Sequence, residues 1–375
     1  MSQLPTDLEL ANRIYDVREV SYYMNIGTAT AAPGSVETGW FDVARLPTGS
    51  AERLPVLVAR GEEDGPTLWI TGAIHGDEVT GIAAAQDVVT DDLANRIRGT
   101  IVCCPILNPA GVRKNDRTSY YHDDDPNRYF PYDVGEQHRP PFVQQLIDER
   151  LFERFSETAD ALVSLHSAWT NERTFTILER VRYGEDRTRE AAERLAAETT
   201  RLADAFGLPQ VREFDVDVQE SYDLQRSFEC AALNAASVPA ITPELGSSRV
   251  VEEKNREAAV AGIRNVMRVM DLLPGEPVPN EAVPESPVDY PVKRVVGPVA
   301  EDSGIVRHHV EPGDVVQPGD PIADVVTPHG EVLSTAESEV EGYVLGRREG
   351  IAVYENDPLV SLVARDEESL VVPDP

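Results

Sequence analysis

The chain has 375 residues, 41% of them hydrophobic, which is enough to bury a core in each of two domains. It carries 66 acidic residues against 34 basic ones, for a net charge of −32, and its lysines are only Lys114, Lys254 and Lys293. Such a surface makes nucleic acid a poor partner. Its self-repulsion is tolerable where high ionic strength screens it, so we expect a protein adapted to a high-salt cytosol.

The first residues, "MSQLPTDLELANRIYDV", have neither a basic nor an apolar segment of the kind that targets a chain for export. No apolar run approaches the length of a membrane span. The three cysteines, Cys103, Cys104 and Cys230, are odd in number and two are adjacent, which argues against a disulfide framework. We therefore expect a cytoplasmic protein without a membrane partner.

Short apolar segments alternate with helical patterns over residues 1–273, which predicts an α/β domain with a mixed, largely parallel sheet flanked by helices. The strand-like segments are "PTLWITGA" (66–73), "GTIVCCPILNP" (99–109), "DALVSLHSAW" (160–169) and "VPAITPELG" (238–246). The helical patterns cover 78–97, 140–158, 187–207 and 255–273.

The pattern changes after residue 273. Residues 274–291, "PGEPVPNEAVPESPVDYP", form an acidic, proline-rich segment that predicts a linker. Residues 292–368 carry short strand-like runs broken by Pro-Gly-Asp and Asn-Asp-Pro turns, and no helical pattern is evident. This segment predicts a small all-β domain, a barrel or a sandwich.

Polar residues follow four of the predicted strands. His75 and Glu78 come after the first strand, Asn108 after the second, and His166 and Glu244 close the other two. An open α/β sheet binds its ligands beyond the carboxyl ends of its strands. We therefore expect these side chains to share one site.

Three of these residues have the side chains of a hydrolytic zinc site. A His, Glu, His set leaves the fourth position of a tetrahedral zinc free for water, and zinc lowers the pKa of that water to about 7. The mechanism also needs a carboxylate that moves a proton from the water to the leaving nitrogen. Glu244 is the remaining acid at a strand end and is the candidate for this role.

The spacing of His75 and Glu78 is not specific by itself. About one chance H-x-x-E is expected in a chain of this composition, and the alternative interpretation is a polar turn between a strand and a helix. His308 and Glu311 in "HHVE" have the same spacing but follow no comparable buried strand. The strand-end position and the matching His166 favour the metal interpretation for residues 75 and 78.

Residues 108–131, "NPAGVRKNDRTSYYHDDDPNRYFP", contain a cluster of arginines in a strongly acidic chain. Arginine binds carboxylates with two parallel hydrogen bonds, so Arg113, Arg117 and Arg128 are candidates for substrate binding. The alternative is an exposed Arg–Asp loop, because Asp123–Asp125 lie among the arginines. The position after a strand end favours substrate binding.

These segments resemble the succinylglutamate desuccinylase/aspartoacylase family of zinc-dependent deacylases, relatives of the metallocarboxypeptidases. "HGDE" resembles the family's H-G-x-E zinc motif, "NPAGVRKNDR" its N-P-x-x and Arg pattern, and "DPNRYFP" its D-x-N-R-x-F motif. "LHSAW" and "TPELG" complete the order, and the resemblance spans roughly residues 45–270.

The resemblance implies a zinc-carboxypeptidase-like fold and a role for each matching residue. It implies that one zinc ion per chain is held by His75, Glu78 and His166, that Glu244 is the catalytic acid/base, that Arg117 stabilises the transition state or substrate, and that Asn127 and Arg128 hold a substrate carboxylate.

Two features depart from the family pattern. The interval between Arg117 and Asn127 carries an additional "TSYYHDD". No residue matches the family's substrate arginine just upstream of Glu244, because Arg226 is too distant, and no pattern selects a tyrosine for the pocket. The acyl group and the amine of the substrate therefore stay open.

The C-terminal segment resembles a barrel-sandwich hybrid, or biotinyl/lipoyl-like, domain. "VEPGDVVQPGDPIADVV" and "VEGYV" resemble its two half-repeats. A carrier of biotin or lipoate needs a lysine between the halves, where this chain has "STAESEVEG". We therefore expect a structural or site-covering domain and no carrier function.

The hypothesis is a zinc-dependent hydrolase that cleaves the amide bond of N-acyl amino acids or similar small N-acyl compounds. A metallocarboxypeptidase acting on peptides would use the same groups and is the alternative. A non-catalytic binding protein that retains the pocket is a third class, which the complete set of metal and proton-transfer groups disfavours. The oligomeric state stays open, a homo-oligomer included.

Overall fold

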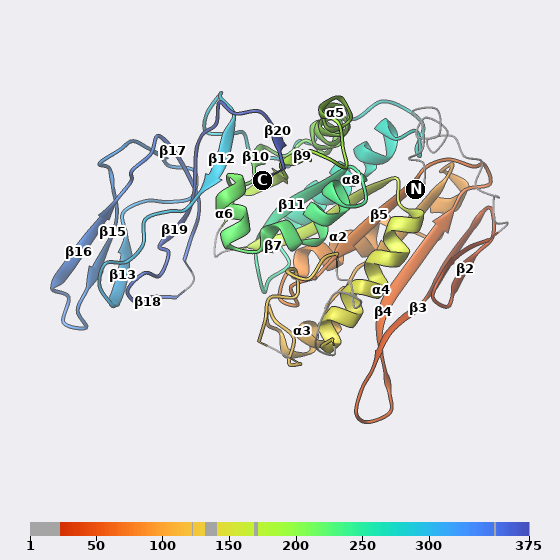
Figure 1. Cartoon of the computed structure of the whole chain (residues 1–375), viewed down its shortest axis with the longest axis horizontal. Coiled ribbons are helices and arrows are strands. Elements are labelled where there is room, and N and C mark those ends of the chain that lie inside the picture. The colour runs from red at the N-terminus through yellow and green to blue at the C-terminus, as the bar shows by residue number, and fades with distance from the viewer. Residues whose placement is uncertain (1–22, 122, 132–140, 169–171, 349, 375) are drawn as a thin grey trace, which may run out of the picture.

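The computed structural model describes residues 23–121, 123–131, 141–168, 172–348 and 350–374, and helices flank a large central sheet (Figure 1). The first 22 residues of the predicted catalytic domain lie outside the described residues. The longer helices are α2 (Val79–Val88), α4 (Val143–Thr158), α5 (Arg189–Phe206) and α8 (Glu253–Val269), and the short ones are α3 (Pro109–Lys114), α6 (Val216–Ser221) and α7 (Phe228–Asn234).

Twelve strands form the central sheet, in the order β14-β17-β19-β12-β10-β8-β11-β7-β5-β6-β4-β3. The strands from the first 273 residues are β3 (Ser35–Arg45), β4 (Ala51–Arg60), β5 (Thr67–Gly72), β6 (Thr100–Cys104), β7 (Ala161–Ala168), β8 (Thr174–Leu178), β10 (Gln210–Arg212) and β11 (Ala240–Ser247). The strands from the C-terminal segment are β12 (Val292–Val295), β14 (Val315–Val316), β17 (Gly342–Arg347) and β19 (Val360–Arg365).

The sheet is mixed, as the sequence predicts. Strands β6, β5, β7 and β11 run parallel to one another, and β8 also pairs with β10 in parallel. The β8–β10 pair runs antiparallel to β11, with Thr242 opposite Ile177. The carboxyl ends of β8 and β10 therefore point the opposite way from those of β5, β7 and β11.

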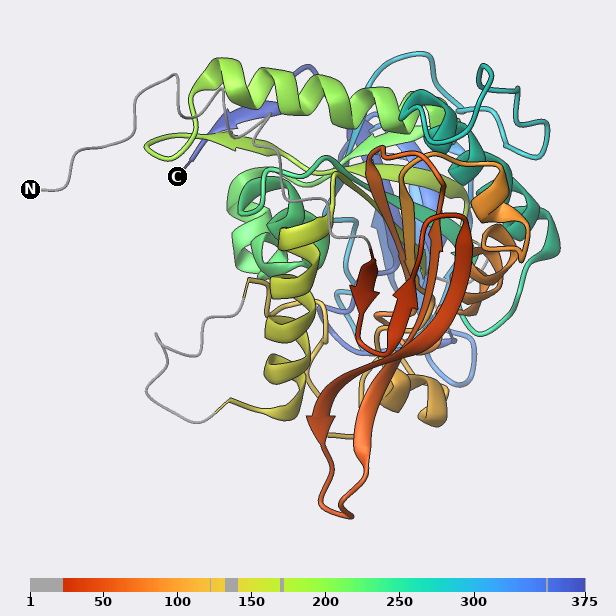
Figure 2. The same ribbon diagram turned by 90° about the vertical axis from the view of Figure 1, so that its right-hand side faces the viewer.

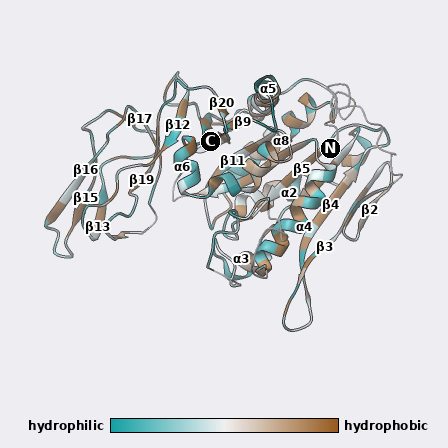
Figure 3. Cartoon of the chain, in the orientation of Figure 1, coloured by the Kyte–Doolittle hydropathy of each residue, from teal (hydrophilic) through white to brown (hydrophobic). Residues whose placement is uncertain are grey.

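Strands β5 and β6 are buried along their whole length, because helices cover both faces of the sheet. Adjacent residues face opposite sides: Cys103 joins the core under α2, α5 and α8, whereas Cys104 joins the core under α4 and α7. Both thiols are free and buried. Figure 3 shows these central strands mostly brown, while helix α4 alternates between brown and teal.

The β3–β4 hairpin extends from the body of the molecule, as the two views in Figures 1 and 2 show. The 11-residue strand β3 is the edge of the sheet. A short hairpin of β1 (Met24–Ile26) and β2 (Ala29–Ala31) lies beside it. No helix in the described part of the chain is long and apolar enough to cross a membrane.

The C-terminal segment is a small antiparallel β region, as expected. Its second sheet has the order β16-β15-β13-β18 and shares one apolar core with the strands at the far end of the central sheet. The strands are β13 (Gly304–His308), β15 (Pro321–Val326), β16 (Val332–Glu337) and β18 (Ala352–Val353).

The central sheet runs without a break from the first 273 residues into the C-terminal segment. Strand β12 pairs in parallel with β10 on one side and antiparallel with β19 on the other. The last strand, β20 (Val371–Pro373), returns to pair with β9 (Val181–Tyr183). The division of the chain into domains at residues 273 and 292 stays a prediction. The catalytic part and the C-terminal β region meet along the hydrogen-bonded strands β10 and β12.

Candidate active site

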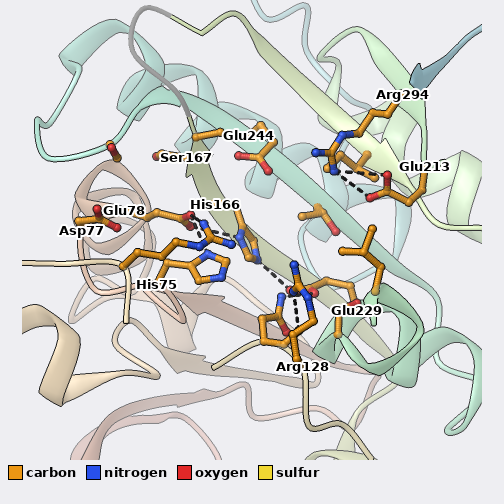
Figure 4. Close-up of a pocket in the computed structure, with 18 of the residues that line it drawn as sticks. His75, Asp77, Glu78, Arg128, His166, Ser167, Glu213, Glu229, Glu244 and Arg294 are labelled. Carbon is orange, nitrogen blue, oxygen red and sulfur yellow. Dashed lines mark hydrogen bonds and ion pairs between the residues drawn. The ribbon is translucent and has the colours of Figure 1, made fainter. Parts of the chain in front are cut away.

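A cavity of about 550 Å³ lies along the carboxyl ends of β5, β7 and β11 (Figure 4). All seven residues that chemistry or resemblance assigns to the site line this cavity: His75, Glu78, Arg117, Asn127, Arg128, His166 and Glu244. Residues up to 169 positions apart in the sequence meet here because the carboxyl ends of parallel strands lie at the same edge of the sheet.

The loop that carries His75 and Glu78 is packed against the start of α3. The backbone N–H of Gly76 donates to the carbonyl oxygen of Arg117 (3.2 Å). A Cβ atom at Gly76 would overlap the backbone of Gly111 and Val112. Glycine is therefore required at this position by close approach of two backbones.

Three side chains that can serve as metal ligands converge in the cavity. Nδ1 of His75 lies 2.7 Å from Oε1 of Glu78, and Nδ1 of His166 lies 3.1 Å from Oε2 of the same carboxylate. The ligand atoms of the three residues all lie within 4.8 Å of one another, and all three side chains are buried. Within the described residues, Oε2 of Glu78 has no hydrogen-bond partner despite the nearby imidazole.

Each imidazole also meets a carboxylate through its other nitrogen. Nε2 of His75 lies 3.1 Å from Oδ1 of Asp125, and Nε2 of His166 lies 2.9 Å from Oε1 of Glu229. In a neutral imidazole whose Nε2 donates to a carboxylate, Nδ1 carries the lone pair that can bind a metal ion on the side of Glu78. A carboxylate behind each histidine is the usual support of a metal-ligating imidazole.

The charges in this cluster favour a bound cation. Burial by itself would lower the pKa of His166, but the negative charges on Glu78 and Glu229 raise it well above its usual range. Burial acts to raise the pKa of Glu78, and the two imidazoles lower it further than burial raises it. The donor set of two imidazoles and one carboxylate fits zinc, with a further position left for water.

Glu244 lies directly beside the cluster, because strand β11 pairs with β7 and sets Glu244 opposite His166. Burial raises the pKa of the Glu244 carboxyl to about 8; the charge on His166 acts against this shift and that on Glu78 adds to it. Among the described residues, its buried Oε2 has no hydrogen-bond partner. Its position and its free oxygen suit a group that exchanges a proton.

Two of the predicted arginines are held at the cavity by Asp125. Arg117 donates to Oδ2 of Asp125 (2.8 Å) and lies 3.6 Å from Glu78, and Arg128 lies 3.4 Å from the same Oδ2. The shared carboxylate orients both guanidinium groups. Asp125 therefore supports one histidine and two arginines, which the "DDD" run in the sequence did not reveal.

Asn127 lines the cavity, and hydrogen bonds tie its amide to the helix α7. Its Nδ2 donates to Oε2 of Glu229 (3.0 Å), and its Oδ1 accepts from the backbone N–H of Phe228 (2.7 Å). Contact with a substrate carboxylate stays a prediction for Asn127 and Arg128. In this structure Asn127 positions Glu229, the carboxylate behind His166.

Other residues singled out in the sequence have structural partners. Asn108, expected in the site from its strand-end position, does not line the cavity and instead caps α3 by accepting from the N–H of Gly111 (2.8 Å). Arg113 forms two hydrogen bonds to the buried carboxylate of Glu52 (2.7 and 2.6 Å), in a cluster that includes Tyr120 and Tyr121, and it does not line the cavity. Arg226 ends a short helical turn, and its carbonyl oxygen accepts from the N–H of Phe130 (2.9 Å).

The second H-x-x-E pair forms no cluster. Nε2 of His308 donates to the carbonyl oxygen of Leu359 (3.0 Å), while Glu311 pairs with Arg347 (2.8 Å). In the part of the chain that the structure describes, the single group of three or more metal-type side chains is that of His75, Glu78 and His166.

The C-terminal segment contributes to the cavity wall. Arg294, on β12, and Arg348, after β17, both line the cavity. Arg294 pairs with Glu213 (3.0 Å), and its guanidinium carbon lies 4.6 Å from the ring centre of Phe214. No local pattern indicated Arg294, Glu213 or Glu229, because each reaches the site when its segment packs against another that is remote in the chain.

The fold and the buried His-Glu-His cluster define an α/β protein with a candidate metal centre. A model of the succinylglutamate desuccinylase/aspartoacylase catalytic domain matches residues 64–270, and the chain belongs to this family. The expected family, one of deacylases, and the expected fold are thus confirmed.

Relatives cover nearly the whole chain. The N-alpha-acetyl-L-2,4-diaminobutyric acid deacetylase of Halomonas elongata is 28% identical over 329 residues, which are 85% of this chain and 88% of the relative. The succinylglutamate desuccinylase/aspartoacylase of Rhodobacter sphaeroides shares the fold with a TM-score of 0.73 at 20% identity, over 89% of this chain and 96% of that one.

The product-bound ectoine utilization protein EutE (DoeB) of Ruegeria pomeroyi has a TM-score of 0.72 at 22% identity, over 88% of this chain and 95% of that one. At these identities the two solved structures establish the fold.

Gly76→Ala is expected to displace the loop that carries both His75 and Glu78. Displacement of reacting groups by about 1 Å costs about 100-fold in rate. We expect kcat/KM on an N-acetyl amino acid to fall by about that factor, with a lower metal content after dialysis. Unchanged metal content and activity in a folded variant would contradict the packing argument.

Glu229→Gln is expected to weaken metal binding without removing a ligand. The carboxylate orients His166 and raises the basicity of its imidazole, and loss of such support costs about 10–100-fold in metal affinity. Competition with a chromogenic chelator measures the affinity. An affinity equal to that of the unaltered protein would show that Glu229 has no supporting role.

Glu244→Gln is expected to make the metal-free protein more stable at pH 8. The raised pKa of Glu244 stabilises the folded state below the ordinary carboxyl pKa, and this contribution is lost as the pH rises towards 8. The variant cannot ionise, so it should gain roughly 2–4 kcal/mol at pH 8 and little at pH 5. Urea unfolding at both pH values, with molar KCl and a chelator, measures the difference.

Proposed function

We propose that the chain is a zinc-dependent hydrolase that removes an acyl group, in the first instance acetyl, from the amino group of an N-acyl amino acid. The observation that carries this proposal is the Glu78 carboxylate between Nδ1 of His75 and Nδ1 of His166, with Glu244 beside them. A carboxylate behind each imidazole supports the same assignment.

A zinc ion held by the three ligands would lower the pKa of a water molecule and polarise the acyl carbonyl. Glu244 accepts a proton from the water as the oxygen forms a bond to the acyl carbon. Arg117 faces the ligand Glu78 and stabilises the negative charge that develops on the carbonyl oxygen. Glu244 then delivers its proton to the leaving nitrogen as the C–N bond breaks, which yields a carboxylic acid and a free amino acid.

Substrate orientation falls to the arginines of the cavity. Arg128 presents a guanidinium group that is already aligned by Asp125 and by the carbonyl oxygens of Asn127 (2.7 Å) and Tyr222 (3.0 Å). A prearranged guanidinium binds a carboxylate with little loss of side-chain entropy. We assign Arg128 to the α-carboxylate, with Asn127 as its neighbour.

The acyl group and amine proposed for a first assay come from the relative in Halomonas elongata, whose name specifies N-alpha-acetyl-L-2,4-diaminobutyric acid. The similarity extends over 85% of this chain and 88% of the relative. The high net negative charge makes molar KCl the appropriate assay medium.

The test is to assay N-acetyl amino acids and short peptides side by side with the zinc-loaded protein. We expect about one zinc per chain, release of acetate, and little cleavage of peptides. Glu244→Gln should keep the zinc and lose at least about 100-fold in kcat. The exposed Glu193→Gln, on α5, is the matched control and should keep full activity.

Four outcomes would overturn the proposal. An active protein with zinc well below one per chain would show that zinc is not required. Full activity in Glu244→Gln would show that Glu244 is not the acid/base. Faster cleavage of peptides than of N-acetyl amino acids would favour a carboxypeptidase. Tight ligand binding without turnover, with zinc present, would indicate a binding protein.

A further inference from the structure

A second group of charged side chains lies at the other end of the cavity, away from His75 and Glu78. It consists of Glu179, Glu213 and Arg294, and Figure 4 shows the last two on the far side of His166 and Glu244 from His75. Glu179 is 5% exposed and Glu213 is 2% exposed. Carboxylates this deeply buried need a partner or a function.

The two carboxylates are neighbours because of the sheet. Glu179 follows β8 and Glu213 follows β10, and these parallel strands end side by side. The backbone N–H of Glu213 donates to the carbonyl oxygen of Leu178 (2.9 Å). The same strand-end geometry that assembles the metal ligands therefore assembles this pair, on strands that run the other way.

When both carboxylates are ionised, these three side chains carry two negative charges and one positive charge. Arg294 pairs with Glu213 at 3.0 Å, whereas Oε2 of Glu179 is buried and, among the described residues, has no hydrogen-bond partner. The positive charge on Arg182 acts to lower the pKa of Glu179. The guanidinium group of Arg182 itself pairs with Glu220 (3.4 Å) and Asp374 (3.7 Å). Burial raises the pKa of Glu179, and the charge on Glu213 adds to the shift.

Thr242 supplies a further acceptor between this cluster and the catalytic groups. Its Oγ1 is buried, and the described part of the chain offers it no hydrogen-bond partner. Thr242 lines the cavity and faces the same side of β11 as Glu244, two residues on. Two residues of a strand span about 7 Å, so this acceptor is within reach of a short substrate side chain.

We propose that Glu179, Glu213 and Thr242 form a binding site for the ammonium group of a cationic substrate side chain. An ammonium group has three N–H donors and no acceptor, which matches a site of carboxylate and hydroxyl oxygens. Its charge balances the surplus carboxylate, whereas an apolar side chain would leave that carboxylate buried and unpaired. The inference rests on the proposed function and adds that the enzyme selects N-acyl diamino acids.

The experiment compares two substrates of equal size in the zinc-loaded protein at molar KCl. N-α-acetyl-L-2,4-diaminobutyrate carries the side-chain ammonium, and N-acetyl-L-norvaline has a methyl group in its place. Loss of one partner from a buried charge pair lowers affinity by about 30-fold or more. We expect kcat/KM to favour the charged substrate by at least about 30-fold.

Glu179→Gln is expected to reduce this preference to within a few fold of unity, and Thr242→Val to reduce it less. The matched control is Glu193→Gln, an exposed residue of α5 that lies outside the cavity and should leave the preference unchanged. Equal kcat/KM for the two substrates in the unaltered protein would overturn the inference, as would an undiminished preference in Glu179→Gln.

Calorimetry separates this inference from the proposed function. Binding of L-2,4-diaminobutyrate and of L-norvaline is measured on the unaltered protein and on Glu179→Gln, which requires no turnover. Stronger binding of the diamino acid that is lost in the variant supports the site even if no N-acetyl amino acid is hydrolysed. Equal binding of both amino acids contradicts the site even if deacetylation is found.

Discussion

The buried carboxylate of Glu78 between two imidazoles is the interaction on which the site depends. An isolated buried carboxylate is costly, and its charge must be balanced by protons on the imidazoles or by a metal ion. Asp125 and Glu229 add two further negative charges behind the histidines. The cluster as a whole therefore favours a divalent cation, which can satisfy all of the converging donors at once.

The rest of the fold holds this cluster in place. Every residue of β5 is buried, so the loop that carries two of the ligands starts from a rigid base. Close contact between Gly76 and the start of α3 fixes that loop, and Asn127 fixes the carboxylate behind His166. Site geometry is set by elements whose own packing leaves them little freedom, which is a general requirement for catalysis.

The C-terminal segment is part of the site rather than an appendage. Strand β12 extends the central sheet, and it carries Arg294 into the cavity wall. Arg294 neutralises Glu213 and leaves Glu179 as the surplus charge. The β region therefore contributes charged side chains to the wall of the cavity.

The local sequence was sufficient to predict the α/β fold and the strand-end residues His75, Glu78, His166 and Glu244, which the structure brings together. Hydrophobic runs mark buried strands, and a polar residue that interrupts such a run at its end is visible without knowledge of the partners. The family motifs then assigned chemistry to those positions, including Arg117 and Arg128.

Only the tertiary structure decided which carboxylates support the histidines and which charged residues line the other end of the cavity. Glu229 enters from the buried face of α7, and Asp125 was indistinguishable from its neighbours in an acidic run. The reversal of β8 and β10 against β11, and the pairing of β12 with β10, placed Glu179, Glu213 and Arg294 on one cavity. Strand direction and strand neighbours depend on contacts between segments far apart in the chain, so no local pattern encodes them.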